Sequence, residues 1–319
     1  MILLGNCMSD TYCSICNTKA VIYLSYGKRS LCKKHFLRYF EKRVKRTVGE
    51  FGLVNGADHL GVALSGGKDS VTTLCLLKEI TSPMKKKLTA ITIDEGIKGY
   101  KNKTIRNAKE ICEKLKVPLH IINFKKEIGF TMDEIMKKKR KKREVSCTYC
   151  GVFRRWILNK AAKELGIDRI AVGHNLDDMI QSFLMNLYRN EPFRLARFGP
   201  KGGIIEDEGF VPRIRPLFRI PEKEVALYAL LKGFKFTLGQ CPYLEEGFRH
   251  VIRSQINDLE SKYPGTKFKL FNSYILIREI LNKSFKEKPE SKISKCKSCG
   301  EPTSTDLCKK CELLSSLNV

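Results

Sequence analysis

Apolar positions follow two different spacings along the central part of the chain. Short apolar runs, bounded by turn or charged residues, predict β-strands at 60–64, 88–93, 119–123 and 169–172. Between these runs, apolar residues recur at helical spacing. The predicted helices cover 69–80, 101–115, 152–165 and 177–187.

This alternation predicts an α/β fold with a Rossmann-like parallel sheet that helices cover on both faces. Connections between parallel strands are right-handed crossovers, so the carboxyl ends of the strands meet at one edge of the sheet. Ligands of open α/β sheets bind at that edge. The chemistry is therefore expected near Ser65, Asp94 and Gly173, each of which follows a predicted strand.

The start of the chain carries a pattern of metal ligands rather than an apolar core. Cys13 and Cys16 form a C-x2-C pair, and Cys32 and His35 form a C-x2-H pair. Four such ligands close a tetrahedral site, and thiolate and imidazole ligands favour zinc. Residues 1–45 are therefore predicted to form an N-terminal zinc-binding module. The alternative is that the four side chains are unrelated.

The end of the chain repeats this pattern with cysteine alone. Residues 284–295 are polar and are interpreted as a linker. Two C-x2-C pairs follow, namely Cys296, Cys299, Cys308 and Cys311. A segment this short needs a metal to fold, so residues 284–319 are predicted to be a linker and a C-terminal zinc ribbon. The catalytic domain is then expected over residues 46–283.

The overall charge narrows the class of partner. The 319 residues include 60 Lys and Arg against 34 Asp and Glu, a formal net charge of +26. This surplus favours a polyanionic partner, with nucleic acid ahead of a membrane surface. The alternative is a lysine-rich surface that is merely solvated. The basic run KKKRKKR, residues 137–143, is expected to contact RNA phosphates, although such runs are usually solvated surface.

The sequence contains no pattern typical of a membrane span or a signal peptide. No apolar run reaches the roughly 18 residues that a span needs. The start, MILLGNCMSD, has no basic region before its short apolar patch. A cytoplasmic location is therefore expected, and 13 cysteines there indicate metal binding more than disulfides. Cys75 and Cys112 fall in helical patterns and are expected to be small core residues.

The first predicted strand runs into the sequence SGGKDS, residues 65–70. Its glycines let backbone amides converge, and the helix that follows directs the positive end of its dipole at the loop. The spacing is neither that of a Walker A loop nor that of a dinucleotide-binding loop. A phosphate-binding loop is predicted, with contacts added by Lys68 and the serine hydroxyls. The alternative is an ordinary strand–turn–helix connection.

This loop closely resembles the PP-loop of the ATP pyrophosphatase superfamily, whose members transfer AMP from ATP to a substrate oxygen and release pyrophosphate. A second segment, GHNLDD at residues 173–178, resembles the GHNxDD loop of the TtcA/TtuA family of tRNA thiolation enzymes. The resemblance covers nearly the whole chain. It looks closest to the archaeal and thermophile-type 2-thiouridine synthetases, and it implies a PP-loop domain flanked by two zinc modules.

Three further cysteines do not complete a zinc site. Cys147 and Cys150 form a C-x2-C pair with no second pair nearby, and Cys241 stands alone. Three thiolates leave one iron of a [4Fe–4S] cluster able to bind sulfide. A redox pair with Cys241 as a bystander fits the spacing equally well. The resemblance implies the cluster, because the family places it on these three positions, while a catalytic persulfide on Cys150 or Cys241 stays open.

The resemblance also implies the reaction and its residues. AMP would be transferred to the C2 oxygen of a uridine in tRNA, and sulfur would then replace that oxygen. Asp69 is expected to organise Mg²⁺, and Arg154 to neutralise developing phosphate charge. Asp178 is preferred to Asp177 for an acid–base or metal-orienting role, and His174 is interpreted as a loop-packing residue. The expected ATP-binding residues are Ala63, Leu64, Ser65, Gly66, Gly67, Lys68, Asp69, Ser70, Ile93, Arg154, Gly173 and Asp178.

The same resemblance implies the partners. The family takes sulfur from a ubiquitin-like thiocarboxylate carrier, from free sulfide or from a desulfurase, and relatives are commonly homodimers. Local spacing does not separate uridine 34 from uridine 54 as the target. Two other functions stay open. One is a PP-loop ligase that adds an amine to an adenylated base or carboxylate, and the other is an RNA-binding zinc-ribbon scaffold with a degenerate nucleotide loop.

Overall fold

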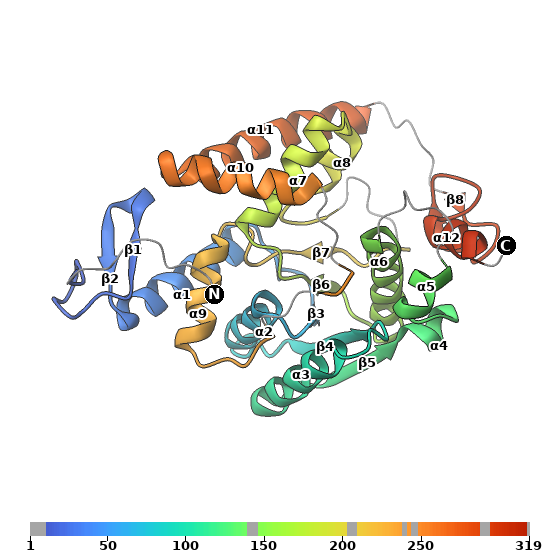
Figure 1. Ribbon diagram of the computed structural model, residues 1–319, viewed down its shortest axis with the longest axis horizontal. Coiled ribbons are helices and arrows are strands. Elements are labelled where there is room, and N and C mark those ends of the chain that lie inside the picture. The colour runs from blue at the N-terminus through green and yellow to red at the C-terminus, as the bar shows by residue number, and fades with distance from the viewer. Residues whose placement is uncertain are drawn as a thin grey trace.

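A parallel β-sheet with helices on both faces forms the centre of the molecule (Figure 1). The computed structural model describes residues 11–138, 146–202, 209–237, 241–243, 248–287 and 294–317. The strand order in the sheet is β5-β4-β3-β6-β7, and the neighbouring strands pair in parallel. The strands are β3 His59–Ala63, β4 Lys87–Asp94, β5 Leu119–Asn123, β6 Arg169–Ala171 and β7 Arg213–Ile214.

Helices alternate with these strands, which confirms the predicted α/β class. The crossover helices are α2 Lys68–Thr81, α3 Lys101–Leu115, α4 Phe124–Ile128, α5 Met132–Lys138, α6 Ser146–Glu164 and α7 Leu176–Tyr188. The sequence does not predict β7, because two residues are too few to give an apolar pattern. No helix in the described part of the chain combines the length and the apolar character that crossing a membrane requires.

Helix α6 begins at Ser146 rather than at residue 152, so its predicted start is wrong. Tyr149 and Phe153 are both buried, one turn apart. This pair extends the apolar face of the helix toward its N-terminus, although cysteine and threonine obscure the pattern in the sequence. As a result, Cys147 and Cys150 lie within the first turns of α6.

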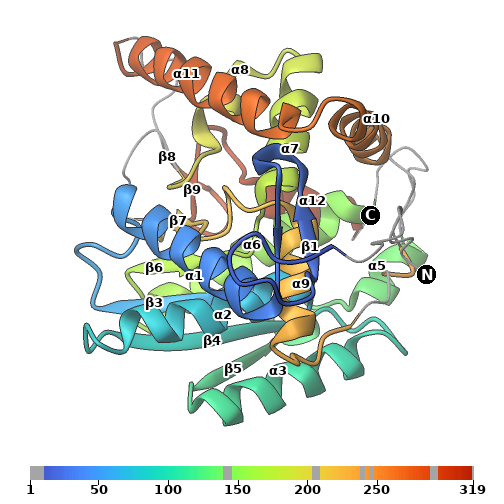
Figure 2. The ribbon, with the colours of Figure 1, turned by 90° about the vertical axis from the view of Figure 1, so that its left-hand side faces the viewer.

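The N-terminal unit combines a small hairpin with a long helix. Figure 2 shows α1 beside α9, Glu222–Leu231. The ring of Phe40 on α1 stacks on Tyr228 of α9, with 4.2 Å between ring centroids. Helix α1 thus continues across residue 45, where the sequence predicts a domain boundary. The elements of this unit are β1 Ile22–Leu24, the 3-10 helix η1 Ser25–Gly27, β2 Arg29–Leu31 and α1 Lys33–Glu50.

A layer of helices covers one side of the sheet, at the top of Figure 1. Within it, α10 and α11 pack against α7, and α11 also packs against α8. Helix α11 continues to Glu287, beyond residue 283, where the sequence predicts the end of the catalytic domain. The bounds are α8 Pro192–Arg197, α10 Phe248–Lys262 and α11 Thr266–Glu287.

The C-terminal unit packs against α6. Leu313 and Leu317 of its helix belong to the same apolar core as Phe153 of α6. The Nζ atom of Lys310 lies 4.1 Å from the ring centroid of Trp156. The unit therefore touches the helix that carries Cys147 and Cys150. Its elements are β8 Ser294–Lys295, β9 Pro302–Thr303 and α12 Lys309–Leu317.

The strands of the sheet contribute to two apolar cores, because successive side chains of a strand point to opposite faces. Ala90 of β4 belongs to the core beneath α1, α2, α7 and α9. Ile91 of the same strand belongs to the core that includes α6 and α12. Cys75 and Cys112 are buried in the first core, as predicted for small apolar residues.

Candidate active site

The loop between β3 and α2 has the geometry of an anion-binding nest. Gly66 has a φ of +79°, and a Cβ atom there would collide with the carbonyl oxygen of Thr104, so only glycine fits. The Ser70 hydroxyl accepts from the Ser65 N–H at 3.2 Å and donates to the Gly67 carbonyl at 3.0 Å. Helix α2 has no side-chain cap. The N–H groups of its first turn can therefore bind an anion.

The GHNLDD segment lies directly against this loop. A Cβ atom on Gly173 would lie 2.9 Å from backbone atoms of Asp69 and Ser70, so the close approach requires glycine. Asn175 caps α7 through a capping box with Asp178. The Nδ2 atom of Asn175 also donates to Asp69 Oδ1 at 3.1 Å. The two segments that the sequence singles out thus form one site.

Lys68 lies between two carboxylates at the start of α2. Its Nζ atom is 2.8 Å from Asp69 Oδ2 and 3.0 Å from Glu222 Oε1. Desolvation lowers the pKa of Lys68, but the charges of Asp69 and Glu222 raise it by more, so the pKa is raised overall. Glu222 is shared with Arg253 at 2.8 Å. A permanent cation therefore stands beside the phosphate loop.

The surroundings of Asp177 indicate a role in packing. Its side chain is buried, forms an ion pair with buried Lys267 and accepts the Glu222 N–H at 2.8 Å. These contacts join α7, α9 and α11 behind the loop. The structure thus gives Asp177 neighbours that satisfy its charge, in keeping with its lower rank in the sequence prediction.

Asp178 is more exposed than Asp177. Its side chain is 35% exposed and lies 3.8 Å from Arg249. Desolvation raises the pKa of Asp178 to about 6, and Asp69 and Glu222 contribute to this rise. A carboxyl group with such a pKa can exchange protons near neutral pH. The raised pKa is compatible with the acid–base role of Asp178, which stays a prediction.

The structure brings the three central cysteines together with the phosphate loop. Cys147 and Cys150 project from the first turns of α6, and Cys241 comes from a separate segment. All three line a cavity of about 200 Å³, which Ser65 and Gly67 also line. Burial raises the pKa of the Cys150 thiol to about 11, and Arg154 opposes this rise. Such a thiol is protonated at neutral pH unless a cation or a metal ion binds it.

Glu95 is a site residue that the sequence analysis missed. It is 4% exposed, and its carboxylate lies 2.6 Å from Lys101 Nζ and 3.3 Å from Arg154 Nε. Desolvation lowers the pKa of Arg154, but Glu95 and Cys150 raise it by more, so the pKa is raised overall. The available signal was the position of Glu95 directly after Asp94, the last residue of β4. Asp94 itself accepts the Gly96 N–H at 3.0 Å and shapes the turn.

Some of the residues expected to bind ATP, namely Ala63, Leu64, Ser65, Ile93 and Arg154, lie together near the ends of β3 and β4. A narrow slot, which shares Ser65, Glu95, Lys101 and Arg154 with the cysteine cavity, is lined by both apolar and charged side chains. Its lining consists of Ala63, Leu64, Ser65, Ile91, Ile93, Glu95, Lys101, Arg154 and Leu158. Of the basic run 137–143, Lys137 and Lys138 end α5, whereas residues 139–143 lie outside the described residues.

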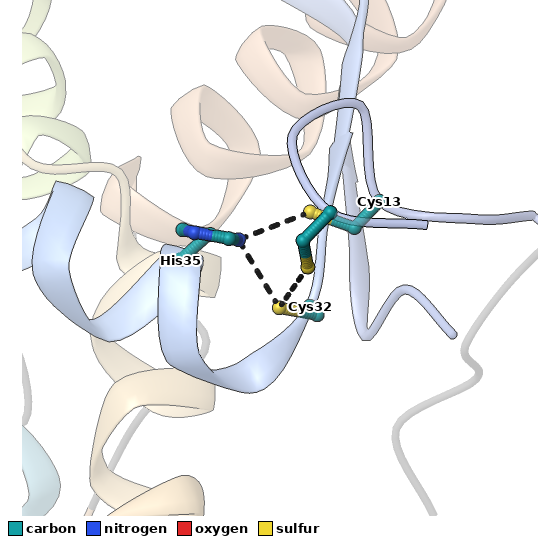
Figure 3. A group of neighbouring side chains, drawn as sticks. Cys13, Cys32 and His35 are labelled. Carbon is teal, nitrogen blue, oxygen red and sulfur yellow. Dashed lines mark hydrogen bonds between the residues drawn. The ribbon is translucent and has the colours of Figure 1, made fainter. Parts of the chain in front are cut away.

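The N-terminal cluster has the geometry of a closed metal site (Figure 3). The Nδ1 atom of His35 lies 3.4 Å from the sulfur atoms of both Cys13 and Cys32. The sulfur of Cys16 lies 3.7 Å from that of Cys32. All four ligand atoms are within 4.8 Å of one another, which suits a single tetrahedral ion.

The C-terminal cluster meets the same criterion. The ligand atoms of Cys296, Cys299, Cys308 and Cys311 all lie within 4.8 Å of one another. The Cys308 N–H donates to Cys296 Sγ at 3.2 Å. This hydrogen bond is the main cause that lowers the pKa of Cys296 to about 6. This hydrogen bond thus favours the thiolate of Cys296, the form that binds a metal.

Together, the parallel sheet, the SGGKDS nest and the adjoining GHNLDD loop define a nucleotide-binding α/β protein of the PP-loop class. A family model described as the PP-loop domain matches residues 36–260. A second model, described as the N-terminal LIM domain of the 2-thiouridine synthetase TtuA, matches residues 12–37. The chain belongs to the TtuA/NcsA family of tRNA 2-thiolation proteins, a branch of the PP-loop superfamily.

Individual relatives are similar over nearly their full length. The chain is 38% identical over 306 residues to a probable sulfurtransferase of Methanocaldococcus jannaschii, covering 95% of this chain and 87% of that protein. It is 36% identical over 301 residues to the tRNA-5-methyluridine(54) 2-sulfurtransferase of Pyrococcus horikoshii, covering 94% and 92%. The structure of the U34-tRNA thiolase NcsA from Methanococcus maripaludis, with its [4Fe–4S] cluster, matches with a TM-score of 0.81 at 32% identity. That match covers 98% of both chains.

Proposed function

We propose that this protein is a tRNA uridine 2-sulfurtransferase that uses ATP to activate the C2 oxygen of its target uridine. The observation that carries the proposal is the shared cavity, which Cys147, Cys150 and Cys241 line together with Ser65 and Gly67. The activated oxygen and the incoming sulfur must meet at one carbon atom, so the two halves of the site have to be contiguous. The tRNA thiolases to which the chain is similar support the same assignment.

The first step is adenylation of the uridine. The C2 oxygen forms a bond to the α-phosphorus of ATP, the bond from that phosphorus to the bridging oxygen breaks, and pyrophosphate leaves. The N3 proton is lost in this step, and Asp178 accepts it. The N–H groups of residues 66–70 and the Lys68 ammonium bind the phosphates, while Arg154 offsets the charge that develops. Asp69 organises Mg²⁺ at the departing pyrophosphate.

The second step replaces the activated oxygen. Sulfide forms a bond to C2, the bond from C2 to oxygen breaks, and AMP leaves with the original oxygen. A proton returns to N3, and no atom is oxidised or reduced overall. When bound, a [4Fe–4S] cluster held by three thiolates supplies one iron that can carry the sulfide.

The central cysteines fit such a cluster. Three thiols surround a cavity of about 200 Å³, and Arg154 and Lys101 on its wall offset the negative charge of the thiolates. A four-iron cluster is larger than one ion, so its ligands stand further apart than those of a zinc site. Cys147, Cys150 and Cys241 would hold the cluster. An amine ligase would leave the three cysteines without use.

Zinc is the metal that we assign to the two terminal clusters. The N-terminal set offers three thiolates and one imidazole, and the C-terminal set offers four thiolates. Both sets are closed, as in structural zinc sites, and leave no position for a reactant. The units that carry these two clusters are then zinc modules on either side of the catalytic domain.

The partners belong to the same proposal. The net charge of +26 supports tRNA as the substrate. The sulfur donor is a ubiquitin-like thiocarboxylate carrier or sulfide, and the active form is a homodimer. The target is uridine 34 or uridine 54, the positions named for the relatives from Methanococcus maripaludis and Pyrococcus horikoshii. A cytoplasmic location suits a tRNA substrate and many unpaired cysteines.

Anaerobic purification and analysis of the tRNA product test the proposal. The wild-type protein should contain about four iron and four sulfide per chain in addition to zinc. With ATP, Mg²⁺ and sulfide it should form 2-thiouridine in tRNA, measured by mass spectrometry of nucleosides. Cys150→Ala should lose the iron and the product. Cys112→Ala, which changes a buried cysteine away from the cavity, is the matched control and should keep both.

Two outcomes would contradict the proposal in different ways. Wild-type protein without iron, together with a fully active Cys150→Ala variant, would exclude sulfur transfer at these cysteines and favour the amine ligase. Failure of ATP to yield pyrophosphate in the presence of tRNA would favour the RNA-binding scaffold. Position 34 is distinguished from position 54 by sequencing the nuclease fragment that carries the thiolated base.

A further inference from the structure

Four arginines meet near the GHNLDD loop, outside the cysteine cavity. They come from α6, from β7 and the residues that follow it, and from α11. Nη2 of Arg213 donates to the carbonyl oxygen of Arg155 at 3.0 Å. Nε of Arg215 donates to His174 Nδ1 at 3.3 Å. The arginine cluster consists of Arg155, Arg213, Arg215 and Arg278.

The segment that follows α8 shapes this cluster. Gly199 accepts a hydrogen bond from Nη1 of Arg215, and a Cβ atom on Gly199 would collide with the guanidinium group of Arg278. A larger residue at this position would displace the Arg278 guanidinium group from its place beside Arg215. The ring of Phe198 supports Arg215, whose guanidinium carbon lies 4.5 Å from the ring centroid. These contacts fix guanidinium groups in place rather than leaving them as mobile surface charges.

The described part of the chain offers the cluster no acidic partner. Neighbouring arginines have carboxylate partners, Arg154 with Glu95 and Arg194 with Glu191. Among the residues that the structure describes, no ion pair reaches the four members of the cluster. The Nε atom of Arg278 is buried and has no hydrogen-bond partner there. Unpaired cations with a buried donor atom are costly, and an anionic ligand would remove that cost.

The excess of positive charge also affects the pKa values of the cluster and of the adjoining GHNLDD loop. Desolvation lowers the pKa of Arg213 and Arg215 to about 10, and neighbouring arginines add to the effect. Desolvation also lowers the pKa of His174 to about 3, with further contributions from Arg215, Arg249, Arg213 and Arg154. Part of the surface of His174 nevertheless reaches solvent, so this positive region borders solvent beside Asp178.

We propose that the arginine cluster binds a backbone phosphate of the RNA substrate beside the activation site. The proposal rests on the proposed function, because it assigns the phosphate to the tRNA. Guanidinium groups bind phosphate oxygens through paired hydrogen bonds. The SGGKDS nest already accounts for the phosphates of ATP, so the second group of cations fits a second phosphate source. A phosphate held here positions the strand next to Asp178 but reads no base.

The test compares two double variants of equal charge. Arg155→Gln/Arg213→Gln removes two guanidinium groups from the cluster, while the backbone carbonyl of Arg155 remains. Arg106→Gln/Lys109→Gln removes two exposed charges from α3 and is the matched control. Binding of tRNA is measured by fluorescence anisotropy over a series of salt concentrations. ATP binding is measured separately by calorimetry.

We expect the cluster variant to bind tRNA about tenfold more weakly, with a slope of log K against log salt that is smaller by about one to two. Its ATP affinity should equal that of the wild type, and the control should change neither quantity by more than about twofold. The single variant Arg155→Gln guards against misfolding, because this side chain is exposed. It should show about half of the change in slope.

Three results would overturn the inference. These are an unchanged tRNA affinity and slope, an equal loss in the α3 control, and a loss of ATP affinity with tRNA binding intact. The last result would assign the phosphate to the nucleotide. Failure of the proposed function is distinguishable, since the wild-type protein would then bind tRNA through the cluster without forming 2-thiouridine.

Discussion

The terminal cysteine clusters and the central cysteines use the same side chain in opposite ways. Each terminal cluster gathers four ligand atoms within 4.8 Å of one another. The three central cysteines instead stand around a cavity of about 200 Å³ beside the phosphate loop. A closed set of four ligands stabilises a fold, whereas an incomplete set on a cavity leaves room for a reactant.

The C-terminal cluster and the central cysteines also differ in the size of the apolar core that surrounds them. The C-terminal cluster is itself the small core of its segment, in which Leu307 packs against Cys296, Cys308 and Cys311. The central cysteines lie on a helix that apolar side chains such as Phe153 already anchor in a large core. Loss of a terminal ligand should therefore change stability, and loss of a central cysteine should change chemistry.

The largest expected effect on stability comes from a terminal ligand. Cys296→Ser should unfold the C-terminal unit, because metal binding, on the order of 10 kcal/mol, supplies the folding free energy of such a unit. Cys13→Ser should unfold the β1–β2 hairpin, whereas α1 stays packed in the large core through Phe36 and Phe40. Measured on protein from which the iron has been removed, Cys147→Ser should change the free energy of unfolding by less than about 0.5 kcal/mol, because this side chain is exposed. Zinc content, urea unfolding and limited proteolysis measure the difference. A large loss of stability in Cys147→Ser would break the comparison.

The single tryptophan of the chain tells the two terminal units apart. Lys310 of the C-terminal unit lies over the ring of Trp156, 4.1 Å from its centroid. Cys296→Ser should therefore uncover the ring and shift its fluorescence to longer wavelength. Cys13→Ser is the matched control, because the N-terminal unit packs against α9 instead. Equal shifts in both variants would show that the two units unfold together.

A change of intermediate size in the free energy of unfolding is expected at the central site, where buried ion pairs of Glu95 stabilise the structure. Glu95→Gln leaves Lys101 and Arg154 without their partner. Breaking a buried ion pair costs about 3–5 kcal/mol, and the partial exposure of Arg154 favours the lower end of that range. Urea unfolding with linear extrapolation measures this loss.

An exposed ion pair of the same length provides the control for that change. Lys125 and Glu134 also lie 2.6 Å apart, but their side chains are 59% and 39% exposed. Glu134→Gln should therefore cost less than about 1 kcal/mol. If Glu95→Gln costs no more than Glu134→Gln, burial does not strengthen the network at the cavity, and the central site needs another source of rigidity.

The features that the sequence predicted are those whose residues lie close together in the chain. The terminal clusters were predictable because metal geometry dictates short spacings between ligands. The SGGKDS loop was predictable because a tight turn between strand and helix needs glycine, as the positive φ of Gly66 shows. The four longer strands of the sheet were predictable from their apolar runs.

The remaining features depend on contacts between distant parts of the chain. Spacing alone could not join Cys241 to the C-x2-C pair, and only the family resemblance suggested it. Glu95 matters because folding brings it to Arg154, which no local pattern encodes. The arginine cluster is likewise assembled from α6, β7 and α11. Tertiary packing decides such groupings, and a single sequence does not display them.

The smallest expected change in stability concerns the two aspartates of the GHNLDD loop. They too differ in burial, one being enclosed and the other partly exposed. Asp177 is buried with Lys267, whereas the side chain of Asp178 is 35% exposed. Folding raises the pKa of Asp178 from its ordinary value of 3.8 to about 6. The folded state therefore favours the protonated form. That contribution is complete below pH 3.8 and is lost as the pH rises through 6.

Asp178→Asn should consequently stabilise the protein at pH 7, measured without ATP or Mg²⁺. The gain should be only about 1 kcal/mol, because a third of the side chain is exposed and solvent screens its charge. It should shrink as the pH falls below 6 and vanish near pH 4. Asp177→Asn is the matched control and should destabilise by about 3 kcal/mol, because it leaves buried Lys267 unpaired. If both variants lost stability at pH 7, Asp178 would be as fully compensated as Asp177, and its carboxylate would have no excess free energy to offer a proton or a metal ion.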